Sequence, residues 1–83
     1  MTTIQIELPD EISWSLKETP DELTREIRMA AAVKLYELGK LSSGRAAQLA
    51  NVSRIAFLQG LSRYGVSVFD LTEAELANDL ANA

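Results

Sequence analysis

A strong helix start lies at Thr19-Pro20-Asp21-Glu22. Threonine is a good N-cap, proline suits the first helical position, and a glutamate three residues after the cap completes a capping box. Gly39 is the next residue suited to a left-handed C-cap. The sequence therefore predicts a helix that runs from residue 20 to about residue 38.

The predicted helix carries apolar residues on two of its faces. One stripe is formed by Leu23, Ile27, Ala31, Leu35 and Leu38, and the other by Met29, Val33 and Tyr36. A helix that is apolar on two sides is buried on two sides. In a chain of 83 residues, we expect one side to meet the C-terminal helices and the other to meet a second subunit.

Two shorter helices are predicted by the stretch SSGRAAQLANVSRIAFLQGL that begins at residue 42. Ser42 or Ser43 caps the first of them. Asn51 suits the turn that follows, because asparagine tolerates a positive φ. Ser53 caps the second helix, and Gly65 ends it.

The spacing within residues 42–63 is typical of a DNA-binding helix-turn-helix. Ala46 and Ala47 allow a close crossing of the two helices, and Phe57 with Leu61 fills the angle between them. An ordinary helical hairpin with capping serines and solvated charges would show similar features. The motif is therefore the leading interpretation, with the hairpin as its alternative.

In a helix-turn-helix the second helix enters the major groove with its N-terminal part. Arg54 and Gln59 are the predicted contacts to base edges, and Ile55 is available for a thymine methyl group. The residues better placed for phosphate contacts are Ser43, Arg45, Ser53 and Arg63.

Charge is unevenly distributed along the chain, whose formal net charge is −4. Residues 1–39 hold eight acids against four bases, residues 40–64 hold four bases and no acid, and residues 65–83 hold four acids and no base. Four bases neutralise only a few phosphates, so DNA binding is expected to need a homodimer on a palindromic site.

The segment IQIEL near the N-terminus alternates apolar and polar residues with a period of two. It predicts a short β-strand that Pro9 closes and that pairs across a dimer, because an edge strand needs a partner. The predicted dimerisation residues are Ile4, Ile6 and Leu8. The following DEISWSLKE could form a short helical turn that carries Ile12, Trp14 and Leu16.

The expected fold is therefore mainly α. It combines a short N-terminal β-strand, a central helix, a helix-turn-helix and a short C-terminal helix in a homodimer. Three parts are expected: a strand and dimerisation segment (1–18), a helical core (19–65) and an acidic tail (66–83). A second capping box at residues 72–75 precedes the C-terminal helix.

The tail combines apolar residues with acids alone, a composition that suits docking on a basic, apolar cleft of a partner protein. The predicted partner-binding residues are Val68, Phe69, Leu71, Leu76 and Leu80. Alternatively, Phe69 and Leu76 cover the core of the domain itself.

Several classes of protein are disfavoured by composition. With no Cys and no His, the chain has no disulfide, no imidazole base and none of the usual zinc ligands, so no metal or cofactor is expected. The carboxylates lie at helix starts or on polar faces, which makes an enzyme the least expected class. No signal peptide or membrane-spanning stretch is visible, and a cytoplasmic location is expected.

The run from residue 23 to residue 80 resembles a family of small prokaryotic helix-turn-helix proteins. Its specific parts are AAAVKLYELGKLS, GRAAQLANVSRIAFL and YGVSVFDLTEAEL. Members are regarded as antitoxins of toxin–antitoxin modules, often beside a PIN-domain ribonuclease. The resemblance implies autorepression of an operon, neutralisation of a ribonuclease toxin by the tail, and a DNA role for Ser43, Arg45, Ser53, Arg54 and Gln59.

Two other functions also fit parts of the sequence. IQIELPDEI resembles the opening of ribbon-helix-helix repressors, in which Thr3, Gln5 and Glu7 would face DNA. Glu7 and the neighbouring acids would repel phosphates, which disfavours readout by this segment. The second alternative is a protein-interaction module that binds no DNA, for which the acidic tail is the motivating feature.

Overall fold

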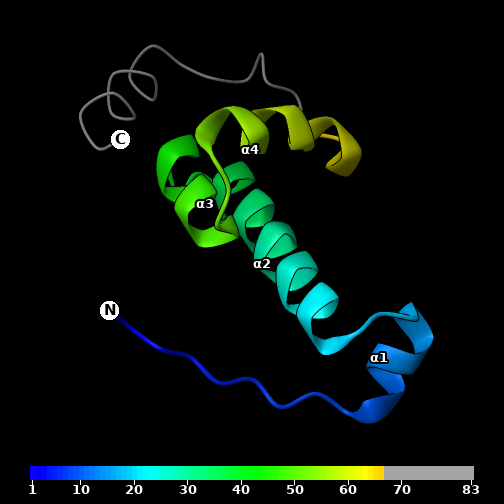
Figure 1. The fold of residues 1–83 in the computed structure, drawn as a ribbon. Helices are drawn as coiled ribbons and strands as arrows, with labels where there is room; N and C mark the ends of the chain where they lie inside the picture. Colours follow the sequence, from blue (N-terminus) through cyan, green and yellow to red (C-terminus); the bar gives the residue numbers. More distant parts are fainter. Residues whose placement is uncertain (67–83) are drawn as a thin grey trace.

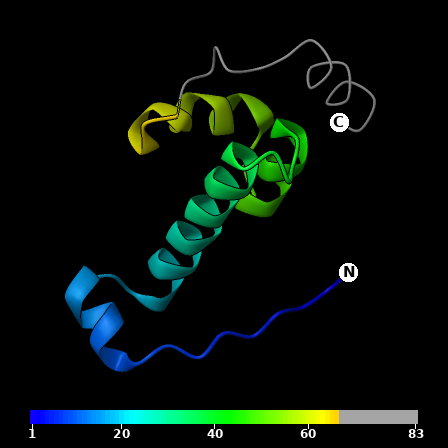
Figure 2. The ribbon, with the colours of Figure 1, turned by 180° about the vertical axis from the view of Figure 1, so that it is seen from behind.

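A computed structural model describes residues 1–66, which form four α-helices and one 3-10 helix (Figure 1). The elements are α1 (Asp10–Leu16), α2 (Pro20–Glu37), α3 (Ser43–Ala50), α4 (Arg54–Gly60) and the 3-10 helix η1 (Leu61–Tyr64). Both ribbon views show α3 and α4 at the C-terminal end of α2 and α1 at its other end (Figure 2). Residues 1–9, named here the arm, run from α1 back toward the end of the molecule where α3 lies.

The prediction of an N-terminal β-strand is wrong, because residues 1–66 contain no strand. The arm has no regular secondary structure. Its apolar side chains are exposed, with Ile4, Ile6 and Leu8 at 79%, 66% and 41%. A strand needs a neighbour for its backbone donors and acceptors, and one chain supplies none here. The predicted dimerisation residues Ile4, Ile6 and Leu8 are thus exposed on a segment without regular secondary structure.

The predicted start of the central helix is confirmed. The Glu22 amide donates to Thr19 Oγ1 at 3.2 Å, and the Thr19 amide donates to Glu22 Oε1 at 3.2 Å. These hydrogen bonds from Thr19 lower the pKa of the Glu22 carboxyl. At the other end, α2 stops at Glu37, and Gly39 adopts a left-handed φ of 76°. The capping signals thus set both ends of α2 to within a residue.

The core lies where α2 crosses α3 and α4. From α2 it takes Ala32, Val33 and Tyr36, and from the C-terminal elements it takes Ala46, Ala47, Ala50, Phe57, Leu61 and Val66. The Tyr36 and Phe57 rings meet edge to face, with centroids 5.6 Å apart and an interplanar angle of 86°. Val66 is buried, so the core extends one residue beyond the predicted boundary at residue 65.

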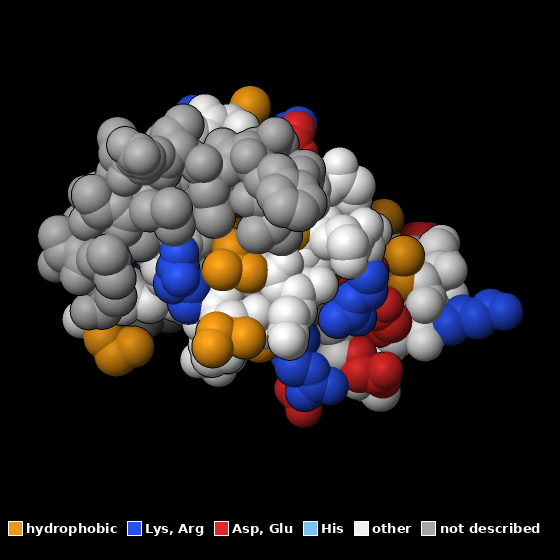
Figure 3. All heavy atoms as spheres, turned by 90° about the horizontal axis from the view of Figure 1, so that it is seen from above, with side chains coloured by type: hydrophobic (Ala, Val, Ile, Leu, Met, Phe, Trp, Pro, Cys, Tyr) orange, Lys and Arg blue, Asp and Glu red, His pale blue; other side chains and the backbone are white. Residues whose placement is uncertain are grey.

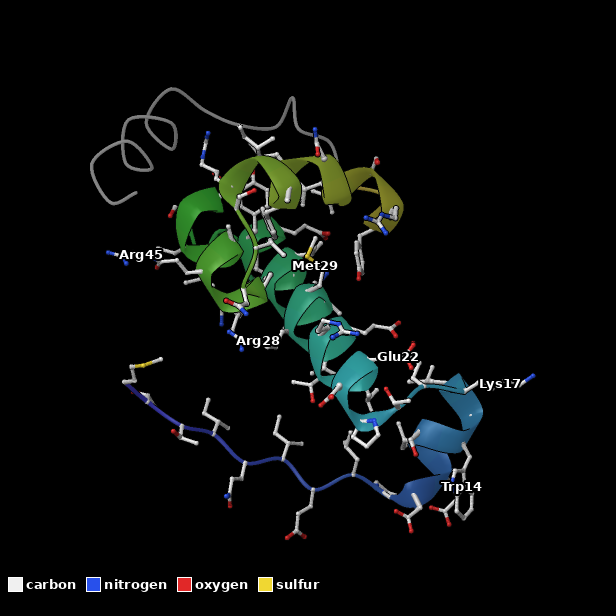
Figure 4. The ribbon with its side chains drawn as sticks, in the orientation of Figure 1. Trp14, Lys17, Glu22, Arg28, Met29 and Arg45 are labelled. Carbon is white, nitrogen blue, oxygen red and sulfur yellow. The ribbon has the colours of Figure 1, made fainter. Side chains whose placement is uncertain are left out.

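Gly60 of α4 lies against the Met29 side chain of α2. A Cβ atom at this position would come within 2.7 Å of the Met29 Cε. Figure 4 shows Met29 on α2 on the side of α4. Small residues at this crossing and in α3 let the short helices pack closely around the aromatic side chains of Tyr36 and Phe57.

The helix α1 contributes no buried residue. The predicted helical turn is present, but Ile12, Trp14 and Leu16 are all exposed. Trp14 and Lys17 point away from the rest of the molecule (Figure 4). Glu18 follows α1. A hydrogen bond with the Glu26 side chain contributes most to raising the pKa of the Glu18 carboxyl, and burial and repulsion from Glu26 and Glu22 raise this pKa further.

None of the helices in residues 1–66 has the length and apolar character that a membrane crossing requires. The predicted C-terminal helix and the partner-binding residues Val68, Phe69, Leu71, Leu76 and Leu80 lie outside the described residues.

Candidate nucleic-acid interface

The helices α3 and α4 follow one another across a short turn at residues 51–53, and each begins at a serine cap. Ser42 caps α3, since its Oγ accepts a hydrogen bond from the Arg45 amide at 3.2 Å. Ser53 caps α4 through the Ala56 amide at 3.1 Å. The choice between Ser42 and Ser43 as the first cap is thereby decided in favour of Ser42.

The turn between the helices is held by backbone hydrogen bonds. The Asn51 amide donates to the Gln48 carbonyl at 3.1 Å, and the Val52 amide donates to the Ala47 carbonyl at 3.0 Å. Asn51 has a left-handed φ of 60°, a conformation that asparagine adopts more readily than most residues other than glycine. A glycine is therefore not required here.

Ser43 and Arg54 connect the starts of the two helices. Ser43 is fully buried, and its Oγ accepts a hydrogen bond from Arg54 Nε at 3.0 Å. The sequence predicts a phosphate contact for Ser43 and a base contact for Arg54. In this geometry Ser43 supports Arg54 from within the fold, and the half-buried Arg54 side chain fixes α4 relative to α3.

The outer face of α4 carries the other predicted base-contact residues. Ile55 is 68% exposed, and Gln59 is also exposed. Residues four apart lie on the same face of a helix, so Ile55 and Gln59 project together on the side opposite buried Phe57. Arg63 follows on η1 and is exposed.

Gln48 is a candidate contact that the sequence reasoning missed. It is exposed on α3, and its Oε1 accepts a hydrogen bond from Arg45 Nη1 at 3.0 Å. Figure 4 shows Arg45 extending away from the helices. The spacing of three residues between Arg45 and Gln48 was a signal that they share a helix face.

Arg28 also joins this region, although it comes from α2. Its Nε donates to the Leu49 carbonyl near the end of α3 at 2.6 Å. A guanidinium at this position interacts favourably with the partial negative charge of a helix C-terminus. Arg28 therefore holds α3 against α2 and was not identifiable from the motif alone.

Comparison with known proteins places the chain in a family. Residues 1–83 match the uncharacterised protein family UPF0175. This chain belongs to the UPF0175 family. One UPF0175 protein of Aeropyrum pernix is 38% identical over 77 residues, which cover 93% of this chain and 81% of the relative.

A second UPF0175 protein of Aeropyrum pernix is 36% identical over 59 residues, which cover 71% of this chain and 75% of the relative. No solved structure matches the chain.

The charge around the interface of this UPF0175 member is positive. Residues 38–66 contain four bases, Lys40, Arg45, Arg54 and Arg63, and no acid. In Figure 3 grey atoms cover much of the left third of the molecule, where Figure 1 places α3, and the described side chains visible there are blue and orange. The local charge favours a polyanion despite the acidic chain.

Proposed function

We propose that this protein is a DNA-binding antitoxin that acts as a homodimer. Two copies of the α3–α4 unit bind neighbouring half-sites of double-stranded DNA and repress the protein's own operon. The acidic segment of residues 67–83 binds a ribonuclease toxin. The antitoxin part of the proposal rests on the resemblance of the sequence to helix-turn-helix antitoxins and on the composition of that segment.

The single observation that carries the DNA-binding proposal is the set of side chains that the capped, alanine-packed α3–α4 unit presents outward. Arg45 and Gln48 on α3 and Ile55 and Gln59 on α4 are exposed. Glutamine forms the hydrogen bonds that read adenine, an aliphatic group suits a thymine methyl, and an exposed arginine such as Arg45 suits a phosphate. Packing against α2 holds these groups on rigid elements.

Few phosphates can be neutralised by one copy. Each phosphate contact changes the slope of log K against log salt by about 0.9, so the four bases of one α3–α4 region give modest affinity. Two copies on a palindrome double the contacts and add the avidity of a bivalent binder. The proposed function therefore requires a dimer.

The first experiment measures binding to a duplex from upstream of the protein's own reading frame by fluorescence anisotropy. We expect Gln59→Ala to cost about 1–3 kcal/mol of affinity and to relax base preference at one position. Arg45→Ala should weaken binding to all sequences and lower the salt slope of the dimer by about 2, one contact from each copy.

Matched controls are Gln5→Ala on the arm and Arg25→Ala on α2, which remove the same side chains away from α3 and α4. Neither should change DNA affinity by more than about twofold, as for most surface substitutions. If Gln59→Ala and Arg45→Ala both retain wild-type affinity and salt slope, the assignment of α3 and α4 as the DNA interface is incorrect.

The second experiment concerns the toxin. We expect removal of residues 67–83 to abolish binding to a ribonuclease encoded beside this reading frame, because that segment carries four acids and no base. DNA binding should persist in the truncated protein. Co-purification and ribonuclease inhibition measure the first outcome, and anisotropy measures the second.

Unchanged toxin binding after the truncation would exclude the tail as the toxin contact. Toxin binding by a full-length protein without any affinity for DNA would instead favour a protein-interaction module.

A further inference from the structure

An apolar groove of about 950 Å³ lies between the arm and α2. Its wall on α2 includes Leu23, Ile27, Ala31 and Leu35, and its opposite wall is the arm with Ile4 and Ile6. Leu49 of α3 also lines the groove. The groove therefore runs along the face of α2 that the first apolar stripe occupies.

This face of α2 points away from the core of the chain. At 100° per residue, the stripe of Ile27 and Ala31 lies on the opposite side of α2 from Ala32 and Tyr36, which pack on α3 and α4. The two apolar stripes seen in the sequence thus have different uses. One builds the fold, and the other lines the groove.

The arm leaves large apolar side chains uncovered, whereas on the α2 wall of the groove Leu23 is buried and Ile27 is half-buried. Ile4 and Ile6 are 79% and 66% exposed. Several of the core residues within 1–66 are alanines, which bury little area. A domain of this size rarely obtains enough stability from one such core without a further subunit.

We propose that the groove receives α2 of a second copy of this chain, in an antiparallel arrangement about a two-fold axis. The Leu23 end of each α2 then packs against the Leu35 end of the other, and each arm flanks the partner's helix. This interface is isologous and closes on itself as a dimer. It uses helix packing and requires no β-strand.

The charge distribution favours an antiparallel pair. Residues 1–26 hold seven acids and two bases, a net charge of −5, and residues 27–66 hold one acid and six bases, a net charge of +5. Antiparallel packing places the negative half of each copy against the positive half of the other. A parallel pair would place like charges together, which disfavours association.

The groove also has the size for a helix. A helix with its side chains is about 10–12 Å across, so 950 Å³ corresponds to about 8–12 Å of its length. This is about two turns, the part of α2 that Ile27 and Ala31 occupy. A single side chain would leave most of this volume unfilled.

The inference deepens the proposed function, because binding to a palindrome rests on two copies. Each α3–α4 unit packs on the C-terminal half of α2, mainly on the side of Ala32 and Tyr36. With helix axes about 9 Å apart and a rise of about 1.5 Å per residue, the two units would lie on the order of 30 Å apart. Half-sites one turn of DNA apart are separated by about 34 Å.

The test uses the full-length protein without DNA, so its failure is distinct from a failure of DNA binding. Light scattering after size-exclusion chromatography should give twice the 9.1 kDa chain mass. Ile27→Asp should give a monomer, and Ile6→Asp should raise the dimer Kd by tenfold or more. Ile6 is exposed and outside the core, so the second variant tests the surface even if the first fails to fold.

Ile55→Asp is the matched control, because Ile55 on α4 is as exposed as Ile6 and lies outside the groove. It should leave the dimer unchanged. A monomeric wild type, or a dimer unaffected by both Ile6→Asp and Ile27→Asp, would overturn the proposal.

Orientation is tested with single cysteines, since the chain has none. Thr24 and Leu35 both line the groove near opposite ends of α2. In a mixture of Thr24→Cys and Leu35→Cys proteins, we expect oxidation to link the two different variants. Linkage of Thr24→Cys only to itself would show a parallel pair and contradict the antiparallel arrangement.

Discussion

Phe57→Ala is expected to lower the free energy of unfolding by about 3–5 kcal/mol, the usual cost of removing a buried phenyl ring. Phe57 is fully buried and packs edge to face on Tyr36. It joins α4 to α2, and the alanines around it are too small to fill the cavity. For a domain of this size that loss is a large part of the total stability, so much of the population should be unfolded.

Chemical denaturation followed by circular dichroism measures this effect. Ile55→Ala, two residues away on the exposed face of α4, is the matched control and should change stability by about 0.5 kcal/mol or less. Phe57→Leu should recover part of the loss because it restores apolar volume. A Phe57→Ala protein within about 1 kcal/mol of the wild type would contradict the described core.

Ile27→Asp is expected to lower affinity for a DNA with two half-sites by a factor of about 10²–10⁴, because a monomer lacks the avidity of two linked binding units. An unpaired carboxylate in an apolar helix interface costs too much desolvation to be retained there. Ile27 lies on the groove face of α2, away from α3 and α4. Affinity for an isolated half-site should stay within about twofold of the wild type, because the DNA-contact residues are untouched.

Anisotropy on full-site and half-site duplexes separates the two proposals. Loss on both duplexes would indicate that the substitution disturbs the α3–α4 unit itself, which the circular dichroism spectrum would also report. Full-site affinity equal to that of the wild type, with a confirmed monomer, would show that DNA binding does not require the dimer. Gln59→Ala should differ from Ile27→Asp in both measurements. It should weaken binding to the full-site and half-site duplexes alike, while the protein remains a dimer.

The sequence predicted the helical elements well because their ends are set by local chemistry. The threonine and serine caps and the left-handed Gly39, Asn51 and Gly65 are all present as predicted. The same patterns failed at the arm. Alternation in IQIEL indicates an extended segment with one apolar face, but a strand exists only where another strand is available to pair with it.

The candidate site was predicted in part. Gln59 and Ile55 lie on the exposed face that the helical period predicts, because side-chain direction on a helix follows from residue spacing. Ser43 and Arg54 could not be assigned from spacing, since their hydrogen bond joins residues 11 positions apart in the chain. Arg28 was missed for the same reason, as its contact with Leu49 spans 21 positions.

The sequence by itself determined where α2 and α3 start and end and where α4 starts, because capping and backbone preferences act within a few residues. It did not show that α4 ends at Gly60 and that a 3-10 helix covers the residues before Gly65. The sequence also determined that α2 has two apolar faces. Only the tertiary structure decided which face builds the core and which one lines the groove, since periodicity is identical for both. Burial of a face depends on what the rest of the chain places against it, and here α3 and α4 cover the face of Ala32 and Tyr36 and leave that of Ile27 for a partner.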